Sequence, residues 1–202
     1  QCALESLRER QSGTLRIVLA INALMFVVEL ASGLLARSTA LLSDSLDNFG
    51  DAATYTASLY AVSRSEHTKA RVALLKGGLM LLGALFVLGQ VGYGLLVPGV
   101  PVFEAMGAVG LLALAANATC LALLHKHRSD DVNMSSVYEC SRNDIASNLS
   151  VFLAAVLVWA TDSGWPDLMV GFCLALLLLR SAFGVTRSAI AHLHAPTANP
   201  LA

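Results

Sequence analysis

Long apolar stretches recur along almost the whole chain, separated by short polar connections. We expect six helices, at about residues 15 to 36, 40 to 63, 72 to 97, 103 to 124, 132 to 159 and 165 to 187. Each is about 20 residues or longer, which is the length a helix needs to cross roughly 30 Å of hydrocarbon. The pattern therefore predicts an all-α integral membrane protein with six transmembrane helices.

Positive charge alternates between the two sides of these predicted helices. Lysine and arginine gather before the first helix, between the second and third, and between the fourth and fifth, at Arg8, Arg10, Arg16, Arg64, Lys69, Arg71, Lys126 and Arg128. The opposite connections hold only Arg37. By the positive-inside rule, both termini are cytoplasmic. We expect a cytoplasmic segment at 1–14, a six-helix membrane domain at 15–190, and a short cytoplasmic tail at 191–202 without a folded C-terminal domain.

Composition excludes several classes of protein. Hydrophobic residues make up 56% of the chain and charged residues only 13%, which leaves almost no room for a water-exposed domain. The net charge is −1 and no basic run is present, so nucleic acid is not an expected partner. The expected surroundings are a lipid bilayer, and acidic residues inside a predicted helix therefore need an explanation.

The stretch "LLSDSLDNFGDAA" at residues 41–53 places three such acids, Asp44, Asp47 and Asp51, in the second predicted helix. A charge near the bilayer centre costs at least a few kcal/mol, so intramembrane carboxylates indicate a functional site. Asp47 and Asp51 are four residues apart and share one helix face. In the fifth helix, "CSRNDIASN" gives Cys140 and Asp144 the same spacing.

These two pairs are expected at similar depth. Counting from the cytoplasmic ends of their helices, Asp51 and Asp144 each lie roughly 20 Å from the inner surface at 1.5 Å per residue. Two facing helices that each carry such a pair can close four side chains around one ion. Carboxylates with a thiolate favour zinc or cadmium over magnesium or calcium. A divalent cation that displaces the carboxyl protons would give metal–proton exchange.

Other polar residues near this site have open roles. Asp44 lies closer to the outer surface, where a cap, a hydrogen bond to a ligand, a vestibule charge and direct ligation are all compatible with its position. Asn22 and Glu29 in the first helix are seven residues apart and share a face. We expect them to hydrogen-bond between helices, and Glu29 also to line the outer half of a pathway.

Three motifs together, "INALMFVVELASG", "STALLSDSLDNFGD" and "CSRNDIASN", resemble the cation diffusion facilitators. The resemblance implies a six-helix transporter, not an enzyme, that exports zinc, cadmium, cobalt and related metals in exchange for protons. It implies metal ligands at Asp47, Asp51 and Asp144. The family usually has histidine where this chain has Cys140, so either Cys140 completes the site or Asn143 or Asn148 supplies an oxygen.

The resemblance also bears on assembly and location. Without a C-terminal domain, a homodimer would be held by the membrane helices, and we expect the chain in a bacterial inner membrane. Zinc or cadmium would be bound as the transported substrate, and no resident cofactor is expected. The alternative is a membrane phosphatidyltransferase, whose motif needs glycine after the second aspartate and an arginine further on. Here Asn48 follows Asp47 and no arginine follows in register, which disfavours the enzyme.

Overall fold

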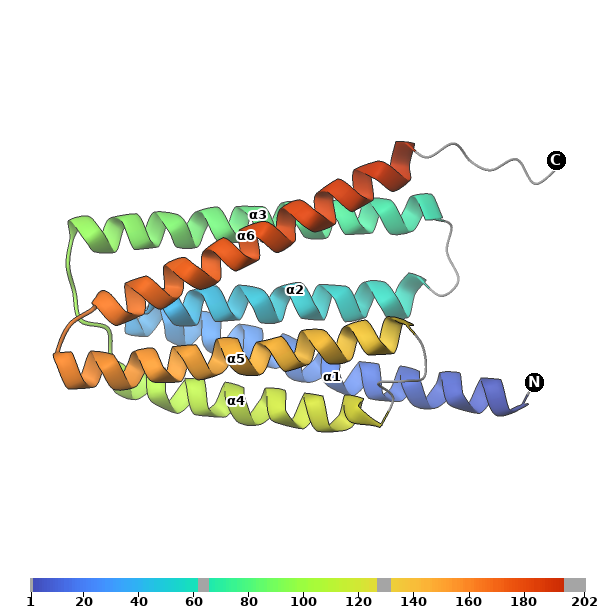
Figure 1. Cartoon of the computed structure of the whole chain (residues 1–202), viewed down its shortest axis with the longest axis horizontal. Helices are drawn as coiled ribbons and strands as arrows, with labels where there is room; N and C mark the ends of the chain where they lie inside the picture. Colours follow the sequence, from blue (N-terminus) through green and yellow to red (C-terminus); the bar gives the residue numbers. More distant parts are fainter. Residues whose placement is uncertain (1, 62–65, 127–131, 195–202) are drawn as a thin grey trace.

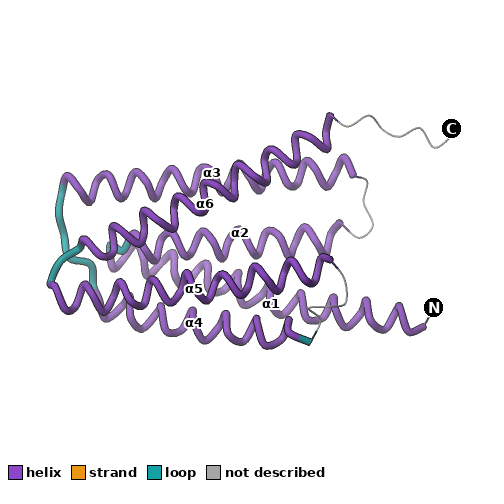
Figure 2. The backbone as a smooth tube through the Cα atoms, viewed as in Figure 1, coloured by secondary structure: helices purple, strands orange, loops and turns teal. Residues whose placement is uncertain are grey.

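The computed structural model describes residues 2–61, 66–126 and 132–194. This part of the chain is helical with short connections and contains no β-strand. The helices shown in Figure 1 are α1 (Cys2–Ala36), α2 (Thr39–Ala61), α3 (Glu66–Leu96), α4 (Phe103–His125), α5 (Val132–Thr161) and α6 (Trp165–His194). Successive helices run in opposite directions along one bundle (Figure 2).

The first residues of α1 and the last of α6 lie at the same end of the bundle (Figure 1). The charge pattern assigns that end to the cytoplasm, and we call it the inner end. Helix α2 packs against α1, α3, α5 and α6, more partners than any other helix has. It is therefore the central helix of the bundle, while α3 and α6 pair with each other on one side of it.

Large apolar side chains cover the outside of five helices. Examples with more than half of their surface exposed are Leu24, Leu35, Leu82, Leu111, Trp159 and Leu177. Among the α2 side chains that the structure describes, no large hydrophobic residue is exposed. In the described residues, α1, α3, α4, α5 and α6 contain spans long and apolar enough to cross a membrane. The all-α membrane fold is thus confirmed, with α2 as a more polar sixth helix enclosed by the others.

The helices extend beyond the predicted apolar spans at the inner end. Helix α1 begins at Cys2 instead of near residue 15, α3 begins at Glu66, and α6 continues to His194. The apolar pattern marks only the part of a helix that meets hydrocarbon, and residues 2–14 contain no proline that would stop the helix. Residues 2–14 of the predicted cytoplasmic segment 1–14 are therefore helical and continue into the rest of α1, and their cytoplasmic location stays a prediction.

At the outer end, Asp167 in the first turn of α6 holds the start of α2. Its carboxylate accepts hydrogen bonds from the Ser38 hydroxyl at 2.6 Å, the Thr39 amide at 2.7 Å and hydroxyl at 2.9 Å, and the Ala40 amide at 3.1 Å. One turn later, Gly171 allows close approach, since a Cβ there would lie 2.7 Å from the Thr39 backbone. Asp167 thus caps α2 from another helix.

Candidate metal centre

Three carboxylates of α2 lie inside the bundle at successive turns. Asp44 and Asp51 are buried, with 2% and 6% of their surfaces exposed, and Asp47 between them is half-buried. Packing of α2 against four neighbouring helices encloses them. A carboxylate in such a place has to find a polar partner, a proton or a cation, because bulk water does not solvate it fully.

Helix α5 brings a fourth carboxyl group to the same region. Asp144 is 8% exposed, and its carboxyl lies within hydrogen-bonding reach of that of Asp51. Asp47 is close enough to Asp144 for their charges to interact. The sequence predicts Asp51 and Asp144 at equal depth, and the structure brings these two residues together. We call Asp47, Asp51 and Asp144 the central carboxylates.

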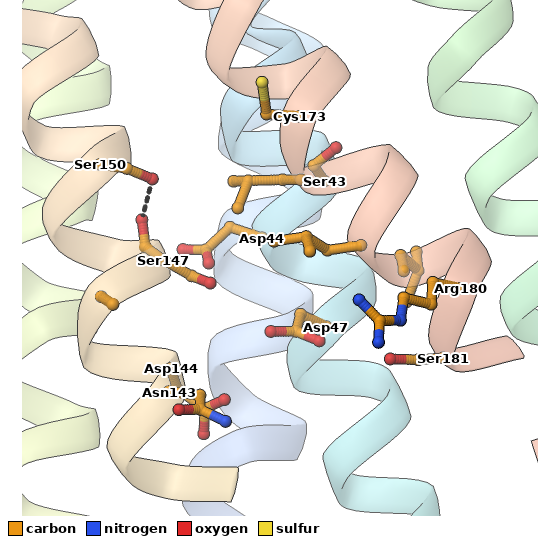
Figure 3. Close-up of a pocket in the computed structure, with 14 residues that line it drawn as sticks. Ser43, Asp44, Asp47, Asn143, Asp144, Ser147, Ser150, Cys173, Arg180 and Ser181 are labelled. Atoms are coloured by element: carbon orange, nitrogen blue, oxygen red, sulfur yellow. Dashed lines mark hydrogen bonds between the residues drawn. The ribbon is translucent and has the colours of Figure 1, made fainter. Parts of the chain in front are cut away.

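A cavity of about 760 Å³ lies beside the central carboxylates, between α2, α5 and α6. Asp44, Asp47 and Asp144 line it, as Figure 3 shows. Its other polar lining residues are Ser43, Asn143, Ser147, Ser150, Arg180 and Ser181. A water molecule occupies about 30 Å³ of liquid, so this cavity has room for a divalent cation with several waters.

Two side chains that were not predicted from the sequence interact with the carboxylates from the inner side. The Tyr55 hydroxyl, buried one turn beyond Asp51, donates a hydrogen bond of 3.2 Å to Asp51 Oδ2. Lys76 of α3 donates to the Thr54 hydroxyl, and its charge attracts Asp47. The four-residue spacing of Asp51 and Tyr55 is a signal for the first partner, whereas no local spacing indicates the second.

The predicted ligands whose side chains the structure describes are Asp47, Asp51 and Asp144, and these three alone do not form a closed coordination shell. Among the side chains that the structure describes, which leave out that of Cys140, no three histidine, cysteine, aspartate or glutamate side chains converge as a metal site. Cys140 belongs to α5, but its side chain lies outside the described residues, and its ligand role stays a prediction. Asn143 lines the cavity, and buried Asn148 donates a hydrogen bond of 2.8 Å to the Asp144 backbone oxygen. Their roles as alternative ligands also stay predictions.

The polar residues of α1 contact neighbouring helices. Glu29 is fully buried, and its Oε2 accepts a hydrogen bond of 2.8 Å from the Asn48 amide of α2. Asn22 is also buried, and its amide donates to the Val18 backbone oxygen at 2.9 Å and to Cys120 Sγ of α4 at 3.9 Å. Polar side chains of this kind join helices in membranes.

Comparison with known proteins agrees with this architecture. Residues 15–194 match the family described as the cation efflux transmembrane domain. The "Cadmium, cobalt and zinc/H(+)-K(+) antiporter" of Bacillus subtilis is 24% identical over 178 residues, which cover 81% of this chain and 57% of that protein. The "Zinc transporter ZitB" of Yersinia pestis is 25% identical over 191 residues, covering 87% of this chain and 61% of the relative.

A further relative is the "Metal cation efflux system protein CzcD" of Cupriavidus metallidurans, 22% identical over 191 residues, which cover 88% of this chain and 60% of the relative. The chain thus spans about three fifths of the length of these curated relatives. The family match covers nearly all of the described bundle. The predicted resemblance to cation diffusion facilitators is confirmed. The match does not support the alternative of a phosphatidyltransferase. This chain is an integral membrane protein that belongs to the cation efflux family, whose members are transporters and not enzymes.

Proposed function

We propose that this protein exports zinc, cadmium and related divalent metals such as cobalt across a bacterial inner membrane in exchange for protons. The observation that carries the proposal is the meeting of buried carboxylates from α2 and α5 beside a cavity that Asp44, Asp47 and Asp144 line. The names of the three relatives support divalent metals as the substrate class. Export, and not import, follows from the family resemblance and from the usual direction of the proton gradient.

The central carboxylates supply the charge that would bind the metal. Two like charges that meet inside the protein repel each other, so a proton or a cation between the Asp51 and Asp144 carboxyls is stabilising. A divalent cation that binds between them displaces that proton and replaces it with two metal–oxygen bonds. Proton and metal therefore compete for the same oxygens, which is the requirement for exchange.

The cavity offers a route for hydrated ions to these oxygens. It is lined by Asp47 of α2, Asp144 of α5, and Arg180 and Ser181 of α6 (Figure 3). Alternating access would require α1, α2, α4 and α5 to rock about the site. In this group, α1 packs against α2 and α4, and α5 packs against the same two helices. A homodimer held through membrane helices belongs to the same proposal, and light scattering of the purified protein in detergent would test it.

The experiment for the function is zinc and cadmium flux into proteoliposomes under an imposed pH gradient, with proton movement followed by a pH-sensitive dye. We expect metal movement coupled to proton movement in the opposite direction, and loss of the flux when a protonophore collapses the gradient. Metal flux of the same rate without a gradient, with no dye response, would refute exchange. Absence of any metal flux would refute the transport proposal for this chain.

A further inference from the structure

A second pair of buried carboxylates lies outward of the central carboxylates. Glu29 of α1 has no exposed surface, and Asp44 of α2 has 2%. Glu29 is seven residues before the outer end of α1, and Asp44 is five residues after the outer start of α2. At 1.5 Å per residue, both lie about 8 to 10 Å inside the outer helix ends. They therefore share a depth, on two helices that pack against each other.

Asn48 ties this pair together. Its amide donates a hydrogen bond of 2.8 Å to Glu29 Oε2. The same amide donates one of 3.4 Å to the backbone oxygen of Asp44, which lies one turn away on α2. The Glu29 and Asp44 carboxylates are close enough for their charges to interact. Asn48 is 4% exposed, so this bridge is enclosed by protein. The bridge fixes one oxygen of Glu29 and leaves the other carboxylate oxygens for another partner.

Several of these oxygens have no hydrogen-bond donor. Within the described residues, Glu29 Oε1 and Asp44 Oδ2 are buried and accept no hydrogen bond. Asn148 Oδ1 of α5 is also buried and accepts no hydrogen bond, and Asn148 has no exposed surface. Asn148 lies one turn outward of Asp144, on the face of α5 that carries Asp144 toward α2. Buried acceptors without donors are destabilising unless a cation or a proton satisfies them.

We propose that Glu29 and Asp44 form a second divalent-cation site, the outer site, which receives the metal from the central carboxylates on its way out. Asp44 lines the same cavity as Asp47 and Asp144, so a cation can pass from one carboxylate to the next within that cavity (Figure 3). This inference rests on the proposed export function. The outer site offers only oxygen atoms, and its discrimination between zinc and harder divalent cations is correspondingly weak.

The test is a count of zinc ions bound by the full chain in detergent micelles, by equilibrium dialysis with Zn²⁺ alone. Glu29→Gln keeps the side-chain shape but removes the charge, and Asp44→Asn does the same on α2. Asp51→Asn removes a central carboxylate, and Glu104→Gln is the control because Glu104 is an exposed acid at the start of α4. A thermal melt of each variant verifies that it is folded.

We expect Glu29→Gln and Asp44→Asn each to bind one zinc ion fewer than the wild type, and Glu104→Gln to bind the wild-type number. The Glu29→Gln, Asp51→Asn double variant should bind two zinc ions fewer than the wild type. In proteoliposomes, Glu29→Gln should lower the maximal zinc flux at least about tenfold, as loss of an ion-binding group does, with a smaller change in KM.

An unchanged zinc count in folded Glu29→Gln and Asp44→Asn would overturn the outer site and leave Glu29, Asn48 and Asp44 as a structural bridge between α1 and α2. That outcome is separate from failure of the export function, because wild-type flux under a pH gradient would persist. If the wild type shows no flux, the zinc count still decides whether the outer site exists.

Discussion

Replacing Asp167 by alanine should destabilise the bundle far more than replacing an ordinary acid at a helix start. The substitution removes four hydrogen bonds between 2.6 and 3.1 Å, all made by a carboxylate with 1% of its surface exposed. It leaves the Thr39 and Ala40 amides, at the first turn of α2, without their acceptor. The contact between α6 and α2 at the outer end then depends on apolar packing and on two hydroxyl groups. The Thr39 hydroxyl donates to the Asp167 backbone oxygen at 3.1 Å, and the Ser43 hydroxyl donates to the Gly171 backbone oxygen at 2.9 Å.

The magnitude follows from these partners. Loss of a helix cap costs about 0.5 to 2 kcal/mol, and each buried donor left unsatisfied costs about 1 to 3 kcal/mol. Because the contributions overlap and water can enter at the helix end, we expect a loss of about 3 to 5 kcal/mol for Asp167→Ala. Asp167→Asn keeps one acceptor oxygen and should lose about half as much. For a chain of this size, 1 kcal/mol corresponds to about 2 to 4 °C in Tm.

The assay is thermal unfolding in detergent, followed by the intrinsic fluorescence of Trp159 and Trp165 near the outer end. The matched control is Glu104→Ala, since Glu104 is also an acid in the first turn of its helix but is exposed. We expect the control to lose less than about 1 kcal/mol, the value of an exposed acid at a helix N-terminus. If Asp167→Ala unfolds within about 2 °C of Glu104→Ala, the capping role is refuted.

Three further substitutions probe the metal centre. Tyr55→Phe removes the hydrogen bond to Asp51 and should weaken zinc binding about tenfold in equilibrium dialysis; unchanged affinity would contradict an orienting role. Arg180→Gln removes a positive charge from the cavity that Asp47 lines and should lower KM for zinc in flux assays, whereas a raised KM would contradict charge repulsion. Cys140→His should retain transport and shift preference from cadmium toward zinc; an unchanged ratio of cadmium to zinc flux would exclude Cys140 as a ligand.

The sequence predicts the membrane class and the approach of Asp51 and Asp144, because both depend on quantities that can be counted along one helix. A span needs about 20 apolar residues, and depth is 1.5 Å per residue. The same counting suggests six helices but not that α2 is the central one. Its carboxylates make α2 the least membrane-like helix by composition, yet enclosure by four neighbours accommodates them.

The remaining partners depend on how helices are rotated against each other, which spacing within one helix does not specify. Asp167 lies 128 residues from Thr39, and nothing local to either residue indicates that they meet. Lys76 of α3 donates a hydrogen bond to Thr54 of α2, and no spacing within either helix predicts this contact. Glu29 is predicted to hydrogen-bond between helices, but its partner Asn48 is fixed only by the packing of α1 on α2.

The most direct test of the metal centre compares zinc flux into proteoliposomes for the wild type, Asp51→Ala and Glu104→Ala under the same imposed pH gradient. Asp51 joins α2 to α5 through Asp144, whereas Glu104 is exposed at the start of α4 and lies outside the cavity lining. We predict gradient-driven flux in the wild type and Glu104→Ala, and its loss in a folded Asp51→Ala. Full flux in Asp51→Ala would contradict the assignment of the central carboxylates as the metal-binding group.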